Sequence, residues 1–345
     1  MRDFFYTLMT DKKNGVIYAP LKAALYLASL AYGAAIAVRR VLYILRIFKS
    51  HSVPIKVVSV GNLTLGGTGK TPFTIALAKI LEGELKKSAA VLIRGYGWDE
   101  QALLKKSLPD IPILVGEDRA KSARKAVRLY GSQFAILDDG FQHWELRRDL
   151  DIVLVDARNP FGNGLLFPRG VLREPKSALK RAGIIVFTKA GGRPDAVAAL
   201  EGAIRGMNSE AVFVEASHSA KRIYDPKERK DRDLSFAGGK KVVLVSGIGD
   251  PEYFEETVKA IGAVIVEHIV FCDHHDYRFR DVERIISVSD AMKPDFLMTT
   301  EKDAVKFARM SFSFGRHTMM QLVIGMEITK GKERLIAGLN SLRCR

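Results

Sequence analysis

Short apolar runs alternate with helical patterns through most of the chain. Runs of Ala, Val, Ile, Leu and Phe without polar positions are typical of strands buried on both faces of a parallel sheet. We expect such strands at 89–93, 134–137, 152–155 and 184–187, and one more at 55–60 that leads into a helix at 73–81. Strands that alternate with helices in this way predict a three-layer α/β domain.

A charged, turn-rich stretch at 225–232 interrupts this pattern, and a second set of elements follows it. This set has apolar runs at 241–246, 263–269, 296–299 and 321–324 and helical patterns such as 252–261 and 281–292. We therefore expect the charged stretch to join two domains. The predicted organisation is an N-terminal segment at 1–50, a first α/β domain at 51–222 and a second, smaller α/β domain at 223–345.

The N-terminal segment contains a long apolar run at 23–38, followed by Arg39 and Arg40. The run is shorter than the about 20 residues that a membrane span needs, and it lacks a convincing signal-peptide cleavage site. Tyrosines and basic residues in and around it favour a helix that lies in, or dips into, the cytoplasmic leaflet of a membrane. A buried core helix and a true single span are the alternatives.

The chain has 345 residues, 47% of them apolar, and a net charge of +15. That charge favours polyanions, phosphorylated ligands or an anionic membrane surface. Nucleic acid is not expected, because the chain has no zinc-ligand spacing and no aromatic RNA-binding signature.

A glycine-rich turn after the predicted strand at 55–60 carries the strongest chemical signal. In such a turn backbone N–H groups converge on phosphate oxygens, Lys70 can reach a terminal phosphate, and the Thr71 hydroxyl can ligate Mg²⁺. Pro72 fits the first helical turn, where a missing N–H costs nothing. The turn predicts a P-loop, although Thr64 stands where the strict pattern has its first Gly. Its residues are Thr64, Leu65, Gly66, Gly67, Thr68, Gly69, Lys70 and Thr71.

The strand at 134–137 ends in Asp138 and Asp139. In P-loop enzymes a carboxylate at the end of a neighbouring strand holds Mg²⁺ opposite the loop hydroxyl. We expect one acid to position the metal and the other to orient a water, Lys70 or the acceptor. Asp156, at the end of another strand, is a weaker candidate for the metal. Gly191 occupies the position at which guanine-reading turns have an Asp, which favours ATP over GTP.

A kinase also needs a group that takes the acceptor's proton or orients its hydroxyl. Two segments offer such groups: Gly116-Glu117-Asp118-Arg119 and the cluster Asp273-His274-His275-Asp276. On the residues alone, the second cluster is also compatible with a metal site or a structural loop.

Taken in order, these motifs resemble the tetraacyldisaccharide 4′-kinase family of lipid A biosynthesis over nearly the whole chain. The resemblance implies ATP- and Mg²⁺-dependent phosphorylation of the 4′-hydroxyl of a lipid A disaccharide 1-phosphate, which yields lipid IVA. It also implies a two-domain P-loop fold and a location at the cytoplasmic face of a bacterial inner membrane. We expect peripheral or monotopic attachment there, and we infer no obligate protein partner. The motifs are Gly61-Asn62, the loop through Pro72, Arg94-Gly95-Tyr96-Gly97, Gly116-Glu117-Asp118, Asp138-Asp139-Gly140-Phe141-Gln142-His143, Arg148-Asp149-Leu150-Asp151, Leu172-Arg173-Glu174-Pro175, Asp273-His274 and Thr300-Glu301-Lys302-Asp303.

By this resemblance, Lys70 and Thr71 serve the phosphates and Mg²⁺, and Asp138 and Asp139 serve the metal and its surroundings. His274 pairs with the catalytic carboxylate. The acceptor side is lined by Asn62, Arg94, Tyr96, Gln142, His143 and Arg173.

The chain departs from the family pattern at two places. The family motif runs Gly-Asp-Glu-Pro with the Asp as proposed base, whereas this chain has Glu117 and then Asp118 and Arg119. We expect Glu117 to be the base, with Asp118 as the alternative. Arg169 stands where a small or apolar residue is expected.

A membrane-associated switch ATPase of the partitioning type is the alternative function, because such proteins have a similar loop. Their signature Lys before the paired glycines is absent here, and Leu65 takes its place. A switch would also have no use for Glu117 or His274. The kinase is therefore the preferred prediction.

Overall fold

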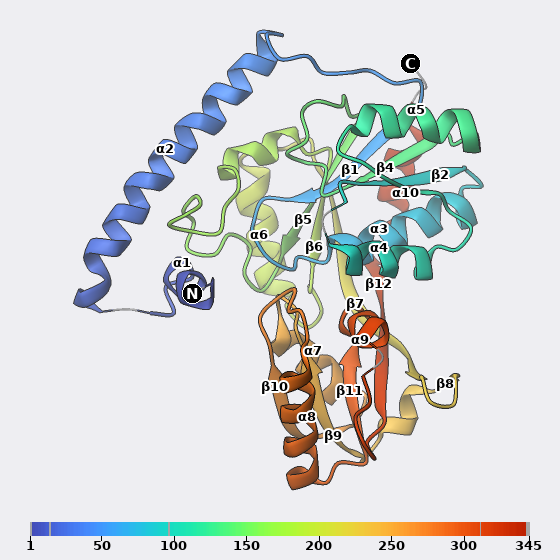
Figure 1. Ribbon diagram of the computed structural model, residues 1–345. Helices are drawn as coiled ribbons and strands as arrows, with labels where there is room; N and C mark the ends of the chain where they lie inside the picture. The colour runs from blue at the N-terminus through green and yellow to red at the C-terminus, as the bar shows by residue number, and fades with distance from the viewer. Residues whose placement is uncertain (1, 14, 96, 311, 343–345) are drawn as a thin grey trace. The chain divides into compact units, whose positions relative to one another are not determined.

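The computed structural model describes residues 2–13, 15–95, 97–310 and 312–342. The chain forms two compact units (Figure 1). The first consists of Met1–Tyr96, Leu108–Ser217 and Glu327–Arg345, and the second of Gly97–Ser107 and His218–Met326.

The first unit is built on a parallel sheet in the order β7-β6-β5-β1-β4-β2-β3. Strand β1 lies at its centre and pairs in parallel with β4 and β5. Because the strands are parallel, the segment that follows β1 and the segment that follows β4 leave the same edge of the sheet. The strands are β1 (Lys56–Asn62), β2 (Ala89–Ile93), β3 (Ile113–Val115), β4 (Phe134–Asp138), β5 (Leu150–Asp156), β6 (Ile184–Thr188) and β7 (Val212–Asp225).

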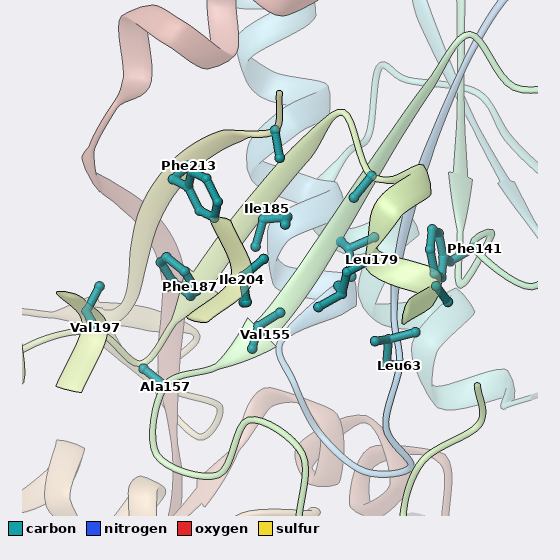
Figure 2. Close-up of a cluster of buried hydrophobic side chains, with 14 of the residues drawn as sticks. Leu63, Phe141, Val155, Ala157, Leu179, Ile185, Phe187, Val197, Ile204 and Phe213 are labelled. Carbon is teal, nitrogen blue, oxygen red and sulfur yellow. The ribbon is translucent and has the colours of Figure 1, made fainter. Parts of the chain in front are cut away.

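Helices cover both faces of this sheet. Alanines of α5 (Arg119–Tyr130) pack on Ala135 and Leu137, and α6 (Pro194–Arg205) packs on Ile185 and Phe187 of the same face (Figure 2). The opposite face contacts α3 (Lys70–Lys79) and α10 (Lys332–Asn340), where Gly338 lies against Ile184. The predicted three-layer α/β architecture is confirmed.

The second unit has a smaller parallel sheet in the order β10-β9-β11-β12. Its strands are β9 (Lys241–Ser246), β10 (Val264–Val270), β11 (Phe296–Thr300) and β12 (Met319–Lys330). Successive residues of β9 join two separate apolar clusters, one on each face. The helices of this unit are α4 (Trp98–Ser107), α7 (Pro251–Ala260), α8 (Phe279–Met292) and α9 (Glu301–Met310).

The charged stretch expected to join the domains forms a hairpin within the second unit. Strand β8 (Lys230–Arg232) pairs antiparallel with the end of β7. Asp225 accepts hydrogen bonds from Lys227 N, Glu228 N and the Arg232 guanidinium, so the charges of this stretch are partners of one another. The compact units instead divide after Ser217 and after Met326, and the domain ranges 51–222 and 223–345 stay a prediction.

The N-terminal segment forms α1 (Arg2–Met9), a 3₁₀ turn at Val16–Tyr18 and the long helix α2 (Ala19–Ile44). By length and composition alone, Val16–Ile44 is long and apolar enough to cross a membrane. Only 6% of its most apolar window is buried, which contradicts the alternative of a buried core helix. Large apolar side chains such as Leu27, Leu30 and Val38 are exposed along it.

Candidate active site

Residues 64–71 form a tight loop between β1 and α3. Gly66 has a φ of 108° and Gly69, the N-cap of α3, a φ of 86°, and these left-handed values favour glycine because a Cβ atom would be strained. Leu65 N donates to Val171 O over 2.7 Å, which ties the loop to a neighbouring segment. Gly66 and Gly67 are exposed, whereas Thr64 and Thr68 are buried. The Thr68 hydroxyl has no hydrogen-bond partner in the described part of the chain.

Thr71 and Asp138 face one another across the edge of the sheet. Asp138 Oδ2 lies 3.4 Å from Thr71 Oγ1, and Asp138 Oδ1 accepts a hydrogen bond of 2.9 Å from Thr74. Adjacent ligands of an octahedral Mg²⁺ at about 2.1 Å are roughly 3 Å apart. The hydroxyl and the carboxylate are therefore spaced to share a small divalent cation, and Thr74 fixes the carboxylate for that role.

Lys70, Asp139 and Arg173 form a charged group beside this pair. Lys70 Nζ lies 3.4 Å from Asn62 Oδ1 and 3.7 Å from Asp139 Oδ1. Arg173 Nη1 donates to both Asp139 oxygens over 2.9 and 2.8 Å. Burial alone would raise the pKa of Asp139, but the charges of Lys70 and Arg173 outweigh it and hold the pKa of this carboxyl below its usual value. Asp139 is thus an anion that orients Lys70.

Gln142 and Asn62 support the loop from behind. Gln142 Nε2 donates to Asn62 O, and Asn62 Nδ2 donates to Thr64 O, each over 2.9 Å. Gln142 Oε1 is buried without a hydrogen-bond partner among the described residues. Such an orphaned polar atom is uncommon in a folded core and is expected where a ligand completes the bonding.

The remaining predicted acceptor residues differ in their environment. Burial, together with the nearby charge of Arg119, lowers the pKa of His143 to about 4, so its imidazole is neutral at pH 7. Arg94 is exposed and also disfavours a second positive charge on His143. Tyr96 lies outside the described residues.

Asp156, the weaker candidate for the metal, is engaged elsewhere. Its Oδ2 accepts a hydrogen bond of 2.5 Å from the Lys189 ammonium. Lys189 is buried, and its positive charge is neutralised by this contact. The structure therefore favours Asp138 over Asp156 as the metal-binding acid.

Glu117 and Asp118 occupy different structural roles. Asp118 is the N-cap of α5, where its Oδ1 accepts a hydrogen bond of 2.8 Å from Lys121 N. Glu117 is exposed, and its carboxylate has no such capping bond in the described structure. This division leaves Glu117 free to act on a ligand while Asp118 holds the helix, although the choice of base stays a prediction.

His274 belongs to the second unit, where its partners are residues of that unit. Its Nε2 lies 3.1 Å from Lys302 Nζ, and its Nδ1 lies 3.4 Å from Asp99 Oδ2. A lysine ammonium only donates, so Nε2 accepts and the ring proton sits on Nδ1, facing Asp99. Burial alone would raise the pKa of Asp99, but the contact with His274 and the charges of Lys302 and Lys306 hold that pKa well below its usual value. The pairing of His274 with Glu117 stays a prediction.

The rest of the Asp-His-His-Asp cluster serves the fold. His275 stacks on Phe271 and its Nε2 lies 2.9 Å from Asp281 Oδ2. Within the described part of the chain, no three His, Cys, Asp or Glu side chains gather as a metal-binding group. The cluster is therefore no transition-metal site in this structure.

Several motif residues hold strands and turns in place. Arg148 pairs with Asp151 over 2.9 Å, and Ser59 of β1 donates to the same carboxylate, which ties β1 to β5. Arg181 donates to both oxygens of Glu174. The buried Asp303 accepts from Gly247 N and Thr300 Oγ1 at the start of α9. These motif residues therefore stabilise the fold, and none of these contacts involves the phosphate loop.

Two polar residues near the predicted sites were not identified from the sequence. Asp99 is buried beside His274 although the two are far apart in the chain. Arg119 is only 4% exposed, and its Nε and Nη1 have no hydrogen-bond partner among the described residues. The only available signal for Arg119 was its departure from the family motif, and the sequence held no signal for Asp99.

The N-terminal helices attach to the segment that supports the phosphate loop. Asp11, after α1, accepts from Lys22 and Arg169 over 2.7 Å each, which explains why an arginine stands at position 169. Tyr32 of α2 donates to Arg173 O over 3.2 Å and packs edge-on against Phe167. One loop, residues 163–173, therefore contacts both the apolar helix and the phosphate-binding residues.

A glycine-rich loop after the central strand of a parallel sheet, with a lysine, a threonine and an aspartate around it, defines a P-loop nucleotide-binding protein. Comparisons with known proteins agree and go further. The family model described as tetraacyldisaccharide-1-P 4′-kinase matches residues 21–341. The chain belongs to this family.

Relatives and a solved structure support the same assignment. The tetraacyldisaccharide 4′-kinase of Halothermothrix orenii is 37% identical over 345 residues, covering 90% of this chain and 89% of that protein. The enzyme of the same name from Anaeromyxobacter dehalogenans is 36% identical, covering 96% and 93%. The crystal structure of LpxK from Aquifex aeolicus in complex with ATP is 26% identical with a TM-score of 0.72, covering 93% of this chain and 99% of that one.

Proposed function

We infer that this protein transfers the γ-phosphoryl group of ATP to the 4′-hydroxyl of a tetraacyldisaccharide 1-phosphate, forming lipid IVA. The observation that carries this inference is the arrangement of Lys70, Thr71 and Asp138 around the glycine loop, in a chain that belongs to the 4′-kinase family. The family acts in lipid A biosynthesis, so the partitioning-type switch ATPase is not supported.

The loop residues bind the nucleotide phosphates, and Thr71 and Asp138 hold Mg²⁺. A Mg²⁺ ion held by these two residues would supply charge neutralisation on the phosphates. Lys70 contacts a phosphate oxygen, and Asp139 with Arg173 keeps its ammonium directed at the loop. Glu117 accepts the proton of the 4′-hydroxyl, and Asn62, Arg94, Tyr96, Gln142, His143 and Arg173 serve the acceptor side.

His274 completes the predicted catalytic set. Asp99 and Lys302 fix the orientation of its ring. These contacts favour the tautomer with the proton on Nδ1. In this proposal the oriented imidazole pairs with the carboxylate base Glu117 and positions it for proton transfer. Asp99 is a positioning residue in this scheme.

The apolar helix α2 places the enzyme at the membrane that contains its substrate. Its exposed Leu27, Leu30 and Val38 need an apolar cover, which acyl chains supply. The net charge of +15 adds attraction to anionic lipid. We propose peripheral or monotopic attachment to the cytoplasmic face of a bacterial inner membrane, where ATP is available, with no nucleic-acid ligand and no obligate protein partner.

The test is transfer of labelled γ-phosphate from ATP to purified lipid A disaccharide 1-phosphate in mixed micelles. We expect transfer that requires Mg²⁺, is abolished by EDTA and is less efficient with GTP. The matched variants are Asp138→Asn, which removes the metal-binding charge, and Asp156→Asn, which changes the competing acid. Severe loss for Asp156→Asn with activity retained by Asp138→Asn would move the metal to Asp156, and no transfer by the wild type would overturn the function.

A further inference from the structure

Arg119 is the first residue of α5, and it is buried with two of its guanidinium nitrogens unbonded among the described residues. Its side chain belongs to a residue only 4% exposed, and its Nε and Nη1 have no hydrogen-bond partner in the described part of the chain. Other well-buried arginines in this unit are paired: Arg148 with Asp151, and Arg181 with both oxygens of Glu174. Arg119 therefore differs from the structural arginines around it.

The strand register places Arg119 at the edge that carries the phosphate loop. Ile93 of β2 pairs with Val115 of β3, and Leu92 of β2 pairs with Leu137 of β4. The residue after Leu137 is Asp138, so β3 and β4 end at the same level. Gly116 N donates to Ile93 O over 3.0 Å, and α5 begins three residues later.

Electrostatics agree with this placement. Burial lowers the pKa of Arg119 to about 10 against the opposing influence of Asp138 and Asp139, so the guanidinium remains charged at pH 7. The same charge contributes to the low pKa of His143. A buried cation is costly unless it is paired, and a ligand anion at this edge would supply the missing partner.

The strand order indicates which anion this is. The loop that binds phosphates follows β1, the metal-binding Asp138 follows β4, and Arg119 follows β3 beyond β2. Along this strand order, Asp138 lies between the glycine loop and Arg119. With the other phosphates in the glycine loop, the terminal phosphate of a bound nucleotide would extend past Asp138 toward Arg119.

We propose that Arg119 binds the γ-phosphoryl group of ATP and follows it during transfer. This assignment rests on the kinase function proposed above and adds to it a phosphoryl-contacting residue at a position where the family motif has proline. The guanidinium donors at Nε and Nη1 match the peripheral oxygens on which charge accumulates in the transition state.

The family motif offers the sharpest variant. That motif has Pro at this position, and Arg119 is the first helical residue after the cap Asp118. Proline is well tolerated there, because the N–H it lacks is not needed within the helix. Arg119→Pro therefore removes the guanidinium and keeps α5, while Arg119→Gln keeps length and polarity without charge. Arg124→Gln, an exposed arginine of the same helix, is the matched control.

The experiment measures dissociation constants of ATP and ADP by titration calorimetry with Mg²⁺ on the full-length protein. We expect Arg119→Gln and Arg119→Pro to weaken ATP binding about tenfold or more relative to ADP and to lower kcat by a similar factor. Arg124→Gln should keep the wild-type ratio. The Tm of the ligand-free variants should equal or exceed that of the wild type, because an unpaired buried charge has been removed.

An ATP-to-ADP ratio unchanged in both Arg119 variants overturns the proposal. A raised KM for the lipid acceptor with that ratio unchanged also overturns it and assigns the guanidinium to an acceptor phosphate. A lower Tm with an unchanged ratio overturns it in favour of a structural role. A wild-type protein that binds neither nucleotide and transfers no phosphate refutes the kinase function itself, which separates the two failures.

Discussion

Replacing Lys70 with methionine tests the centre of the mechanism. The change removes the ammonium and keeps most of the side-chain volume. In the structure this ammonium lies 3.7 Å from Asp139 Oδ1 and 3.4 Å from Asn62 Oδ1, and its side chain is 16% exposed. It is therefore shielded from water, and its charge is available to a phosphate oxygen at the loop.

The expected loss of kcat depends on the charge that the ammonium contacts in the transition state, and the expected change in stability depends on its contacts in the free protein. Removing one preorganised donor to developing charge costs roughly 2.7–4 kcal/mol, which is about 100- to 1,000-fold in kcat. Stability should change little, because Asp139 keeps Arg173 at 2.8 Å and a partly exposed ion pair contributes about 1 kcal/mol or less. The Tm should therefore shift by no more than about 2–4 °C.

The assay is steady-state transfer of labelled phosphate with saturating lipid, together with thermal unfolding of the same preparation. Lys79→Met, at the exposed end of the same helix, is the control and should behave as wild type. A Lys70→Met enzyme with kcat within tenfold of wild type and unchanged Tm would refute the reasoning. A large fall in Tm together with lost activity would show that Lys70 mainly stabilises the fold.

Three further predictions follow from other parts of the structure. Leu27→Glu combined with Leu30→Glu should reduce flotation with anionic vesicles at least about tenfold, since each buried leucine contributes roughly 1.5–3 kcal/mol. Between pH 6.5 and 4 the unfolded chain should bind a proton at His143 that the folded chain does not, because the folded pKa is about 4. Stability should therefore fall as pH falls through this window, by up to about 1.4 kcal/mol per pH unit, and chemical denaturation of His143→Gln should show a shallower slope. Glu117→Gln should lower kcat without changing Tm, whereas Asp118→Ala should cost about 1 kcal/mol of stability through loss of the helix cap.

Each of these has a matched comparison. Leu129→Glu, an exposed apolar position on α5, should leave flotation unchanged, and equal flotation of the double variant would place the membrane contact elsewhere. Parallel pH profiles for wild type and His143→Gln would show that this imidazole titrates alike in both states. Asp118→Asn should preserve the cap; a severe kcat loss there with Glu117→Gln tolerated would move the base by one residue.

The strands and the phosphate loop were predictable because local pattern determines them. Apolar runs such as 134–137 are typical of buried strands in a chain this rich in helical patterns, and the glycines at 66 and 69 are needed for left-handed φ. The second-unit hairpin was not predictable in the same way. An eight-residue stretch with seven charges is typical of a solvated linker, and only the ion pair across the turn, Arg232 with Asp225 over 3.0 Å, makes it a hairpin.

Site contacts between segments that are distant in the sequence could be predicted only where a known motif implies them. The separation of Thr71 and Asp138 follows from β1 lying next to β4, a fold-level fact that the strand–loop–helix motif implies. The partner of His274 does not follow from any motif, because Asp99 reaches it through packing of α4 in the second unit. The sequence thus predicts the candidate reacting groups, whereas the neighbours that orient them, such as Asp99 beside His274, are found only in the packed structure.

The contacts of residues 163–173 connect the exposed apolar helix α2 to the residues of the phosphate loop within the first unit. Arg169 binds Asp11 beside α1, Arg173 O accepts from Tyr32 of α2, and the Arg173 side chain holds Asp139. A lipid that contacts α2 is thereby adjacent, along one short segment, to the anion that orients Lys70. If the acceptor is bound at the membrane as proposed, it has to meet a nucleotide dissolved in water, and this segment, bonded to both the apolar helix and the residues of the phosphate loop, links those two environments.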